Sequence, residues 1–218
     1  MCGRFASFKN QEKLKNIFDL KNKKDKIFSS YNISPGQNIS VIFNYEFHNY
    51  VLPSYWGYSF INNETNKKQL VINSRLETIN NKMLFKESFL KRKCIIPING
   101  YYEWKTENND KIPYYIQLGD GELIFLAGIW RKEIINNQKT RVFCIITKEA
   151  SNSITDIHDR MPFILNANNA TKYLENQNDN SFLSDTNINQ GIDLNYHEVS
   201  KFVNSPKNND VKCLEPLN

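Results

Sequence analysis

The second residue of the chain is a cysteine, in the opening Met1-Cys2-Gly3-Arg4-Phe5. Once Met1 is removed, Cys2 carries a free α-amine next to its thiol. Such a pair condenses with an aldehyde: the amine forms an imine, and the thiol closes a five-membered thiazolidine on the imine carbon. The amine titrates at about 7.7 to 8.0 and a cysteine thiol at about 8.5, so both react near neutral pH. Cys2 is therefore a candidate nucleophile.

Three further segments combine residue types that suit a reaction centre. Residues 72–78 offer the amide of Asn73, and residues 157–162 hold His158, one of three histidines in the chain. Residues 99–104 set Glu103 among aromatic side chains, where a buried carboxylate is unfavourable unless it has a partner or a function. With Cys2, these segments supply a nucleophile, an acid, an imidazole and an amide.

Each of these residues also has a purely structural interpretation. Asn73 suits a turn, Arg75 and Glu77 suit a surface ion pair, and a lone histidine such as His158 is more often hydrogen-bonded than catalytic. The combination with Cys2 is what favours chemistry.

Composition and cysteine spacing limit the class of protein. The 218 residues suit one domain, residues 1–218, and the net charge of +5 permits an anionic partner without requiring one. The four cysteines lie far apart, with no metal-ligand spacing, so we expect reduced thiols, no metal and no cofactor. The sequence has no apolar leader or membrane-length segment, so we expect a cytoplasmic protein.

Hydrophobic periodicity predicts helices over residues 11–20, 81–92 and 168–175. Strands are predicted over residues 40–45, 51–55, 94–98, 114–118, 123–130, 141–147 and 197–202, with Pro97 confining its run to a sheet edge or a strand end. Residues 21–26, 62–68 and 176–190 read as loops. Since strands outnumber helices and short turns join them, we expect an α+β fold: a curled, barrel-like mixed or antiparallel β-sheet flanked by a few helices.

The chain resembles the SOS response-associated peptidase (SRAP) family along most of its length. The motifs follow the family's order: the opening Met-Cys-Gly-Arg-Phe, Ser34-Pro35-Gly36, Trp56-Gly57, residues 73–78, residues 92–97 leading to Gly100-Tyr101-Tyr102-Glu103-Trp104, residues 158–162, and Val203-Asn204 followed by Glu215-Pro216-Leu217. The sequence departs from the family pattern at Leu76, Tyr101 and Lys86, where the family usually has Ala, Phe and Arg. None of these changes removes a candidate reacting group.

The resemblance implies a protein that senses abasic sites in single-stranded DNA. Cys2, freed of Met1, would form a covalent thiazolidine DNA-protein crosslink that shields the site from strand cleavage and reverses slowly. Glu103, whose aromatic surroundings favour its protonated form, would move the proton that opens the sugar ring. His158 would hydrogen-bond the released hydroxyl, and Asn73 would orient the amine and the sugar. A self-processing peptidase activity that exposes Cys2 is also implied, although a host aminopeptidase could do the same.

DNA contacts follow from residue type. Arg4, Arg75 and Arg160 are the candidate phosphate contacts, with Lys82 and Lys86 as weaker ones, because Lys86 lacks the arginine fork. Trp104, Met83 and Phe85 are candidates for stacking on flanking bases, although each suits core packing equally well. We expect a monomer that acts on abasic single-stranded DNA, with the replication machinery as a further partner, and that associates with the nucleoid when bound.

Two other functions remain open at this point. Cys2, His158 and either Asn73 or Glu103 could form a conventional cysteine or N-terminal-nucleophile peptidase. A non-covalent reader of modified single-stranded DNA would need only the basic face and Trp104. Neither predicts a stable adduct with abasic DNA.

Overall fold

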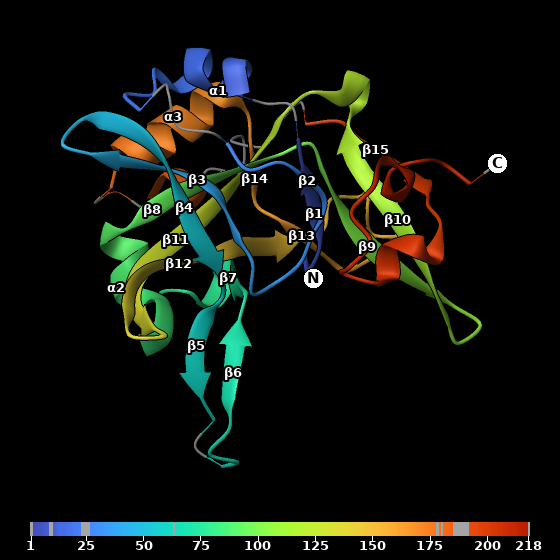
Figure 1. The fold of residues 1–218 in the computed structure, drawn as a ribbon, viewed down its shortest axis with the longest axis horizontal. Helices are drawn as coiled ribbons and strands as arrows, with labels where there is room; N and C mark the ends of the chain where they lie inside the picture. The colour runs from blue at the N-terminus through green and yellow to red at the C-terminus, as the bar shows by residue number, and fades with distance from the viewer. Residues whose placement is uncertain are drawn as a thin grey trace.

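The structure is a computed structural model that describes residues 2–8, 11–22, 27–62, 64–177, 179, 181–184 and 192–217. Its centre is a closed ring of five strands (Figure 1): β3 (Asn38–Tyr45), β4 (His48–Trp56), β8 (Lys93–Ile98), β11 (Ile124–Ile135) and β12 (Gln138–Glu149). Neighbouring strands are antiparallel except β4 and β12, which are parallel. The expected barrel-like mixed sheet is confirmed.

Strand alternation divides the barrel residues into an inner and an outer set. On β12, Phe143 and Ile145 belong to the inner apolar cluster, whereas Cys144 and Ile146 pack with the helices outside. The covering helices are α1 (Gln11–Phe18), α2 (Met83–Lys91) and α3 (Ala167–Glu175). Gly128 marks how tightly the ring closes, because a Cβ there would lie 2.4 Å from the Ile96 side chain.

Short strands extend the barrel at the ends of β12 and β11. β7 (Asn73–Arg75) pairs parallel with β12, β13 (Arg160–Pro162) pairs antiparallel with β12, and β14 (Ile164–Leu165) pairs with β11. β12 therefore holds a strand that carries Asn73 at one edge and the strand that follows His158 at the other.

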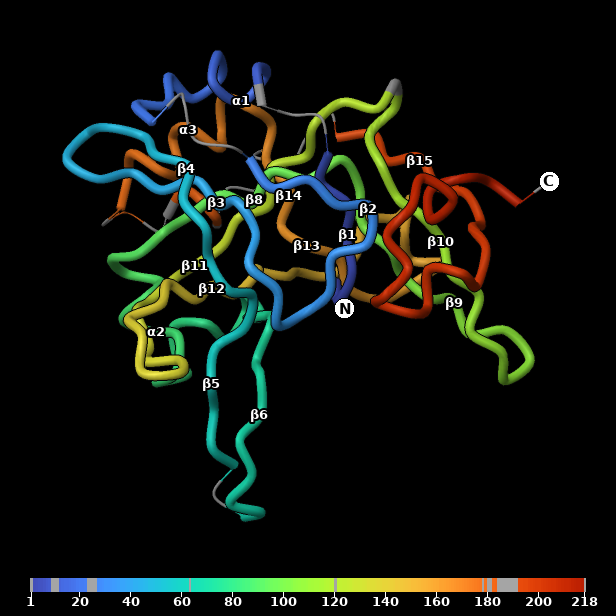
Figure 2. Tube along the Cα trace, viewed as in Figure 1, coloured from blue at the N-terminus to red at the C-terminus, as the bar shows by residue number. Residues whose placement is uncertain are grey.

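A second sheet packs beside the barrel, in the order β15-β10-β9-β1-β2. Its strands are β1 (Phe5–Ser7), β2 (Ser30–Ile33), β9 (Gly100–Glu107), β10 (Asp110–Leu118) and β15 (Leu194–Glu198), and each neighbouring pair is antiparallel. The N-terminal strand lies between the barrel and β9 (Figure 2). Its Phe5 joins the inner barrel cluster together with Tyr101 of β9.

A two-stranded hairpin projects from the body of the molecule (Figure 1). It consists of β5 (Tyr58–Ile61) and β6 (Lys68–Val71), which pair antiparallel with each other and form a sheet of their own. We call these two strands, with the turn residues 64–67, the arm.

Most predicted elements are confirmed, with shifted ends. The three helices occur where they were predicted, and the strands predicted over residues 40–45 and 51–55 are longer than predicted and pair as an antiparallel hairpin. Pro97 lies near the end of β8, beyond the residues that pair with β3, as a strand-end proline should. The turns Asn108-Asn109 and Asn136-Asn137 have positive φ, which asparagine tolerates better than most residues.

Two predictions need correction. Residues 62–68 were expected to form a polar loop, but Lys68 begins β6, and both strands of the arm went unpredicted because their exposed residues show no clean alternation. The last strand was expected at residues 197–202; β15 ends at Glu198, and Lys201–Asn204 form a 3-10 turn begun by the Ser200 side chain, which accepts a hydrogen bond from the Phe202 amide. Much of the expected loops 21–26 and 176–190 lies outside the described residues.

Candidate active site

Cys2 lies fully buried where the N-terminal segment enters β1. Its carbonyl oxygen accepts a hydrogen bond of 2.9 Å from the Asn73 side-chain amide. Asn73 is carried by β7 and Cys2 precedes β1, so one contact joins the barrel extension to the N-terminus. The Asn73 Oδ1 atom is buried and has no hydrogen-bond partner among the described residues. The Asn73 side chain thus donates to Cys2 through its nitrogen and keeps its oxygen as an unused hydrogen-bond acceptor.

The Cys2 thiol is held in its neutral form. Burial raises its pKa far above the usual value, and the negative charge of Glu103 raises it further. The Glu103 charge likewise raises the pKa of the buried Tyr101 phenol, after burial and Cys2. Because the charges of these groups affect one another, Glu103, Tyr101 and the Cys2 thiol lie close together.

Strand geometry explains why Glu103 faces Cys2. Tyr101 and Glu103 stand two residues apart on β9 and so share a face, and Tyr101 packs in the inner cluster with Cys2. Tyr102 and Trp104 point to the other face, against the C-terminal turns. Glu103 is 3% exposed, so the expected burial among aromatic side chains is found.

Gly100, which begins the aromatic motif, has a packing role. A Cβ at this position would lie 2.5 Å from the Tyr115 ring and 2.6 Å from the Ile116 carbonyl oxygen of β10. Any larger residue would push β9 away from β10. The glycine therefore sets the position of Glu103 three residues further on.

His158 and Glu103 line the same cavity, of about 530 Å³. We call it the β9 cavity; its other lining residues are Trp104, Thr106, Lys111 and Asn204. The His158 Nδ1 atom lies 2.9 Å from the Arg160 amide and 2.7 Å from an Asp159 carboxylate oxygen. A neutral ring accepts from the amide at Nδ1 and carries its proton on Nε2, whereas a protonated ring pairs with Asp159. In either protonation state, the His158 ring is held at its Nδ1 edge.

Asn73 also lines a second groove, of about 740 Å³. We call it the arm groove. Its walls are the arm on one side and the start of α2 on the other; it is lined by Phe60, Val71, Asn73, Arg75, Lys82, Met83, Leu84 and Phe85. The Asn73 and Arg75 side chains share a face of β7, and Arg75 is exposed. The sequence candidates Arg75 and Met83 are thus brought next to Asn73.

The apolar candidates differ in what they offer. Met83 is 95% exposed at the start of α2, whereas Phe85 is 3% exposed and packs against Tyr58 in the outer core cluster. Phe85 therefore contributes mainly to packing, with part of its ring reaching the arm groove. Lys86 is exposed on α2 but does not line the groove.

Arg4 lies against Trp104, which lines the β9 cavity. The Arg4 guanidinium lies 5.8 Å from the centre of the Trp104 ring and donates hydrogen bonds of 2.8 Å to Asn32 Oδ1 and to the Val203 carbonyl. The Trp104 indole donates to Asn204 Oδ1 at 2.8 Å. Half-burial lowers the Arg4 pKa, yet arginine stays charged at neutral pH.

Arg160 has a carboxylate partner that its sequence context did not reveal. Its guanidinium donates two hydrogen bonds, of 2.9 and 3.0 Å, to the two carboxylate oxygens of Glu77. Although burial alone would raise the Glu77 pKa, these bonds outweigh it and hold the pKa below its usual value. Arg75, which was the alternative partner for Glu77, stays exposed. A phosphate contact from Arg160 would have to share or break its pair.

Sequence reasoning missed several residues that line the two spaces. They are Thr106, Lys111 and Asn204 in the β9 cavity and Phe60 in the arm groove. Within the described part of the chain, no group of three or more His, Cys, Asp or Glu residues is arranged to hold a metal ion. The helices described there are all too short or too polar to cross a membrane.

The fold and the site define an α+β barrel protein built around a buried cysteine at the second position. The chain belongs to the SRAP family, whose model, "SOS response associated peptidase (SRAP)", matches residues 1–206. The abasic site processing protein YoaM of Bacillus subtilis is 33% identical over 227 residues, covering 100% of this chain and 99% of that protein. The abasic site processing protein YedK of Escherichia coli is 27% identical over 225 residues, covering all of both chains.

A solved structure supports the fold. A crystal structure of a Bacteroides thetaiotaomicron protein superposes with a TM-score of 0.76, covers 100% of both chains and is 24% identical in sequence. The family resemblance inferred from the motifs is confirmed by the family model and by the relative of 33% identity.

Proposed function

We propose that this protein senses abasic sites in single-stranded DNA and crosslinks to them through Cys2 after Met1 has been removed. The names of its relatives, abasic site processing proteins, support the substrate. The observation that carries the chemistry is the position of Cys2, whose carbonyl is held by the Asn73 amide at 2.9 Å while its thiol feels the charge of Glu103.

The first step is ring opening of the abasic deoxyribose, which exists mostly as a closed hemiacetal. The Glu103 carboxylate takes the proton of the anomeric hydroxyl and passes it to the ring oxygen, so that the bond between C1′ and the ring oxygen breaks and the aldehyde is released. His158, which shares the β9 cavity with Glu103, hydrogen-bonds the sugar hydroxyl that ring opening creates. The cavity of about 530 Å³ has room for one sugar.

The second step joins the protein to the DNA. The Cys2 amine attacks the aldehyde carbon and one water leaves, which gives an imine. The Cys2 thiol then adds to the imine carbon and its proton passes to the nitrogen, which closes the thiazolidine. Asn73 orients the amine and the sugar. By microscopic reversibility, the same proton transfer through Glu103 can run backwards and allow slow release of the DNA from the crosslink.

The raised pKa of the Cys2 thiol favours this chemistry over a conventional cysteine peptidase of many turnovers, whereas removal of Met1 from the same chain happens only once and tolerates a scarce thiolate. A cysteine peptidase depends on a thiolate, which a lowered pKa provides. Burial and Glu103 shift Cys2 in the other direction. Thiazolidine closure uses the neighbouring amine as the first nucleophile, so the neutral thiol is no obstacle.

Nucleic-acid contacts flank the reacting groups. Arg4 and Arg75 are the proposed phosphate contacts, with Lys82 at the arm groove and the exposed Lys86 of α2 as weaker ones, and Arg160 would reach a phosphate only by giving up part of its pair with Glu77. Trp104 and Met83 are proposed to stack on bases, with a smaller part for the buried Phe85. The protein is proposed to work as a single-domain monomer in the cytoplasm, near replication forks, and to shield the lesion from strand cleavage.

Removal of Met1 belongs to the proposal because the α-amine is otherwise an amide. The chain would remove Met1 by its own peptidase activity, or an aminopeptidase would do so. Intact mass measurement of protein made by cell-free synthesis, with an aminopeptidase inhibitor present, separates these routes. Loss of Met1 in wild type but not in Glu103→Gln or Cys2→Ala indicates self-processing.

The test is incubation of Met1-free protein, verified by mass, with a single-stranded oligonucleotide that carries one abasic site. We expect a heat-stable shifted band on a denaturing gel. The matched control is a tetrahydrofuran analogue, which has no aldehyde and should give no band. A non-covalent reader or a conventional peptidase predicts no band with either oligonucleotide, and that result would remove the crosslinking proposal.

A further inference from the structure

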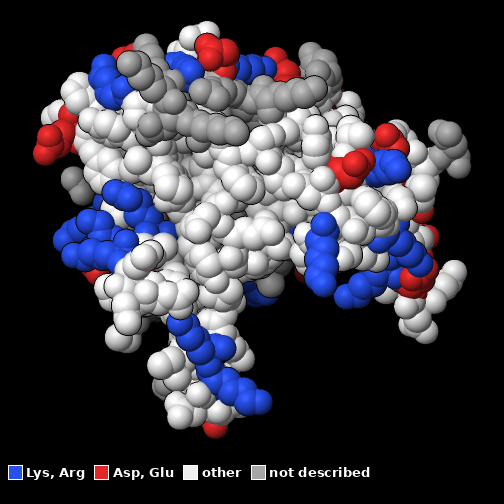
Figure 3. Space-filling view, in the orientation of Figure 1, with Lys and Arg blue, Asp and Glu red and all other residues white. Residues whose placement is uncertain are grey.

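Tyr101 of β9 has a buried hydroxyl that makes no hydrogen bond with any described residue. The side chain is 0% exposed, unlike the Lys and Arg side chains that Figure 3 shows at the surface, on both sides of the hollow beside the arm. An unpaired buried hydroxyl is unfavourable, and such groups are rare in folded proteins. Tyr101 stands where the family pattern usually has Phe, so packing does not require the oxygen.

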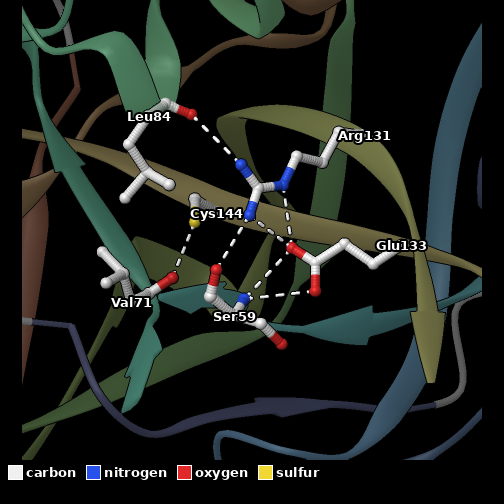
Figure 4. A network of polar contacts seen from close by, with 6 residues as sticks. All are labelled: Ser59, Val71, Leu84, Arg131, Glu133 and Cys144. Atoms are coloured by element: carbon white, nitrogen blue, oxygen red, sulfur yellow. Dashed lines mark hydrogen bonds and ion pairs between the residues drawn. The ribbon is translucent and has the colours of Figure 1, made fainter. Parts of the chain in front are cut away.

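Other buried and half-buried polar groups around the barrel do find partners (Figure 4). The Cys144 thiol of β12 donates to the Val71 carbonyl at 2.8 Å. Arg131 of β11 donates to the Ser59 carbonyl at 2.9 Å, and Glu133 accepts hydrogen bonds of 3.1 and 3.2 Å from the Ser59 amide. The unpaired Tyr101 hydroxyl contrasts with this network.

Tyr102, the next residue of β9, shows how a buried tyrosine is paired in this sheet. Its hydroxyl donates to the Tyr31 carbonyl at 2.7 Å. Because neighbouring residues of a strand point to opposite faces, Tyr101 packs in the inner barrel cluster and Tyr102 packs on the other face of β9. The two tyrosines are equally buried, and they differ in whether the hydroxyl has a partner.

The Tyr101 ring lies next to the groups that react in the proposed function. Tyr101 pairs with Phe5 across β9 and β1, and Cys2 belongs to the same inner cluster as both. Glu103 stands two residues further along β9, on the same face as Tyr101. The charges of Cys2 and of Glu103 both act on the phenol, which agrees with this placement. The unpaired hydroxyl therefore belongs to the space around Cys2.

The Tyr101 phenol is a hydrogen-bond donor near neutral pH. Burial raises its pKa well above the usual value, and the neighbouring charges of Cys2 and Glu103 raise it further. A phenol that keeps its proton does not act as a base, but it can donate one hydrogen bond. Its contribution must come from an acceptor that arrives with the substrate.

The aldehyde of the abasic site brings such an acceptor. Its carbon must come within bonding distance of Cys2, which is itself fully buried. The aldehyde oxygen is one bond further away, so it enters the space that Cys2 shares with Tyr101. When the amine attacks, negative charge develops on this oxygen, and a fixed donor in a site without bulk water stabilises such charge strongly.

We propose that Tyr101 is a further catalytic residue, whose hydroxyl donates a hydrogen bond to the aldehyde oxygen while the Cys2 amine attacks the carbonyl carbon. The C–N bond forms as the second C–O bond opens onto the oxygen. The two amine protons then leave with that oxygen as one water, which gives the imine, and Tyr101 keeps its own proton throughout. The proposal rests on the proposed function and adds a residue to its second step.

The aldehyde oxygen is a better target for the hydroxyl than the Cys2 sulfur. The sulfur already lies in the same cluster, yet the Tyr101 hydroxyl makes no hydrogen bond to it. Sulfur is also a weak acceptor, whereas a carbonyl oxygen that gains negative charge is a strong one.

The test compares Tyr101→Phe with Tyr102→Phe, because each change removes one buried hydroxyl from neighbouring residues of β9. Both variants are freed of Met1, and single-turnover crosslinking is measured at saturating abasic single-stranded DNA. Anisotropy gives the affinity for the tetrahydrofuran probe, a single-stranded oligonucleotide with one tetrahydrofuran site and no aldehyde. Urea unfolding gives the stability of each variant.

We expect Tyr101→Phe to slow crosslinking by about tenfold, the effect of one hydrogen bond. Probe affinity should match wild type, and the urea midpoint should stay at or above the wild-type value, because the lost hydroxyl has no partner in the free protein. Tyr102→Phe should lower the urea midpoint, since it loses the bond to Tyr31, and should crosslink at the wild-type rate. A wild-type rate in Tyr101→Phe, or equal slowing in both variants, would overturn the proposal.

The Cys2→Ala background separates the oxygen from the sulfur as the target of the hydroxyl. This background forms only the imine, and its rate of trapping by cyanoborohydride reports attack of the amine on the aldehyde. Adding Tyr101→Phe should slow trapping by the same factor as it slows crosslinking. Unchanged trapping would overturn the proposal, because the hydroxyl would then act on the sulfur.

Failure of this proposal is distinguishable from failure of the proposed function. If wild type forms no adduct with abasic DNA, the proposed function fails and the role of Tyr101 fails with it. If wild type and Tyr101→Phe crosslink at equal rates, the proposed function stands and only the role of Tyr101 is removed.

Discussion

The β9 cavity, which Glu103 lines, and the arm groove, which Asn73 lines, are built differently. In the β9 cavity, Glu103 is 3% exposed, and the partly exposed His158 is held by a backbone amide and the Asp159 carboxylate. The arm groove offers exposed side chains, such as Met83, on a projecting hairpin and a short helix. Under the proposed function, the proton-transfer residue is therefore held by the core, whereas the proposed DNA contacts Arg75 and Met83 are exposed side chains that can adapt to a strand.

The largest effect is expected from Glu103→Gln in the β9 cavity. The amide keeps the shape but cannot transfer the proton, so crosslink formation at saturating DNA should slow by about a hundredfold or more. Release should slow as well, and affinity for the tetrahydrofuran probe should stay within about twofold. Single-turnover crosslinking and anisotropy measure the two quantities. Unchanged rates in both directions would remove Glu103 from proton transfer.

Asn73 lines the arm groove and bonds the Cys2 carbonyl, so Asn73→Ala is expected to affect both DNA binding and crosslinking. Loss of the 2.9 Å bond to the Cys2 carbonyl should slow crosslinking by about tenfold, consistent with roughly 1.4 kcal/mol for one hydrogen bond. Probe affinity should fall by a smaller factor, since Asn73 also lines the arm groove. A variant with wild-type crosslinking rate would show that the amide only packs.

Arg75 and Arg160 test whether a free and a paired arginine act differently. Arg75→Gln should reduce the slope of log binding constant against log salt by about 0.7, the value for one phosphate contact with a single strand. Arg160→Gln should instead lower the free energy of unfolding by about 1 kcal/mol, because it removes the two-bond pair with Glu77, whose partly exposed carboxylate stays hydrated. Urea unfolding and salt titration separate these outcomes. A change of salt slope in Arg160→Gln alone would reverse the assignment.

The sequence predicted the barrel, and the grouping of Cys2 with Asn73 and of Glu103 with His158, better than it predicted the arm. These four residues stand in motifs whose neighbours are core residues, so the motif and the position in the fold agree. The arm stands in no motif, because its exposed residues show no clean alternation. The pairing of Arg160 with Glu77 spans 83 residues, a separation that residue spacing cannot reveal.

The most direct test of the central claim is Cys2→Ala, free of Met1, incubated with abasic single-stranded DNA with and without borohydride. The variant keeps an N-terminal amine but has no thiol at that residue. We predict no heat-stable adduct in the untreated reaction and a trapped imine after reduction. A heat-stable adduct in the untreated reaction, equal in yield to that of wild type, would contradict thiazolidine formation by Cys2.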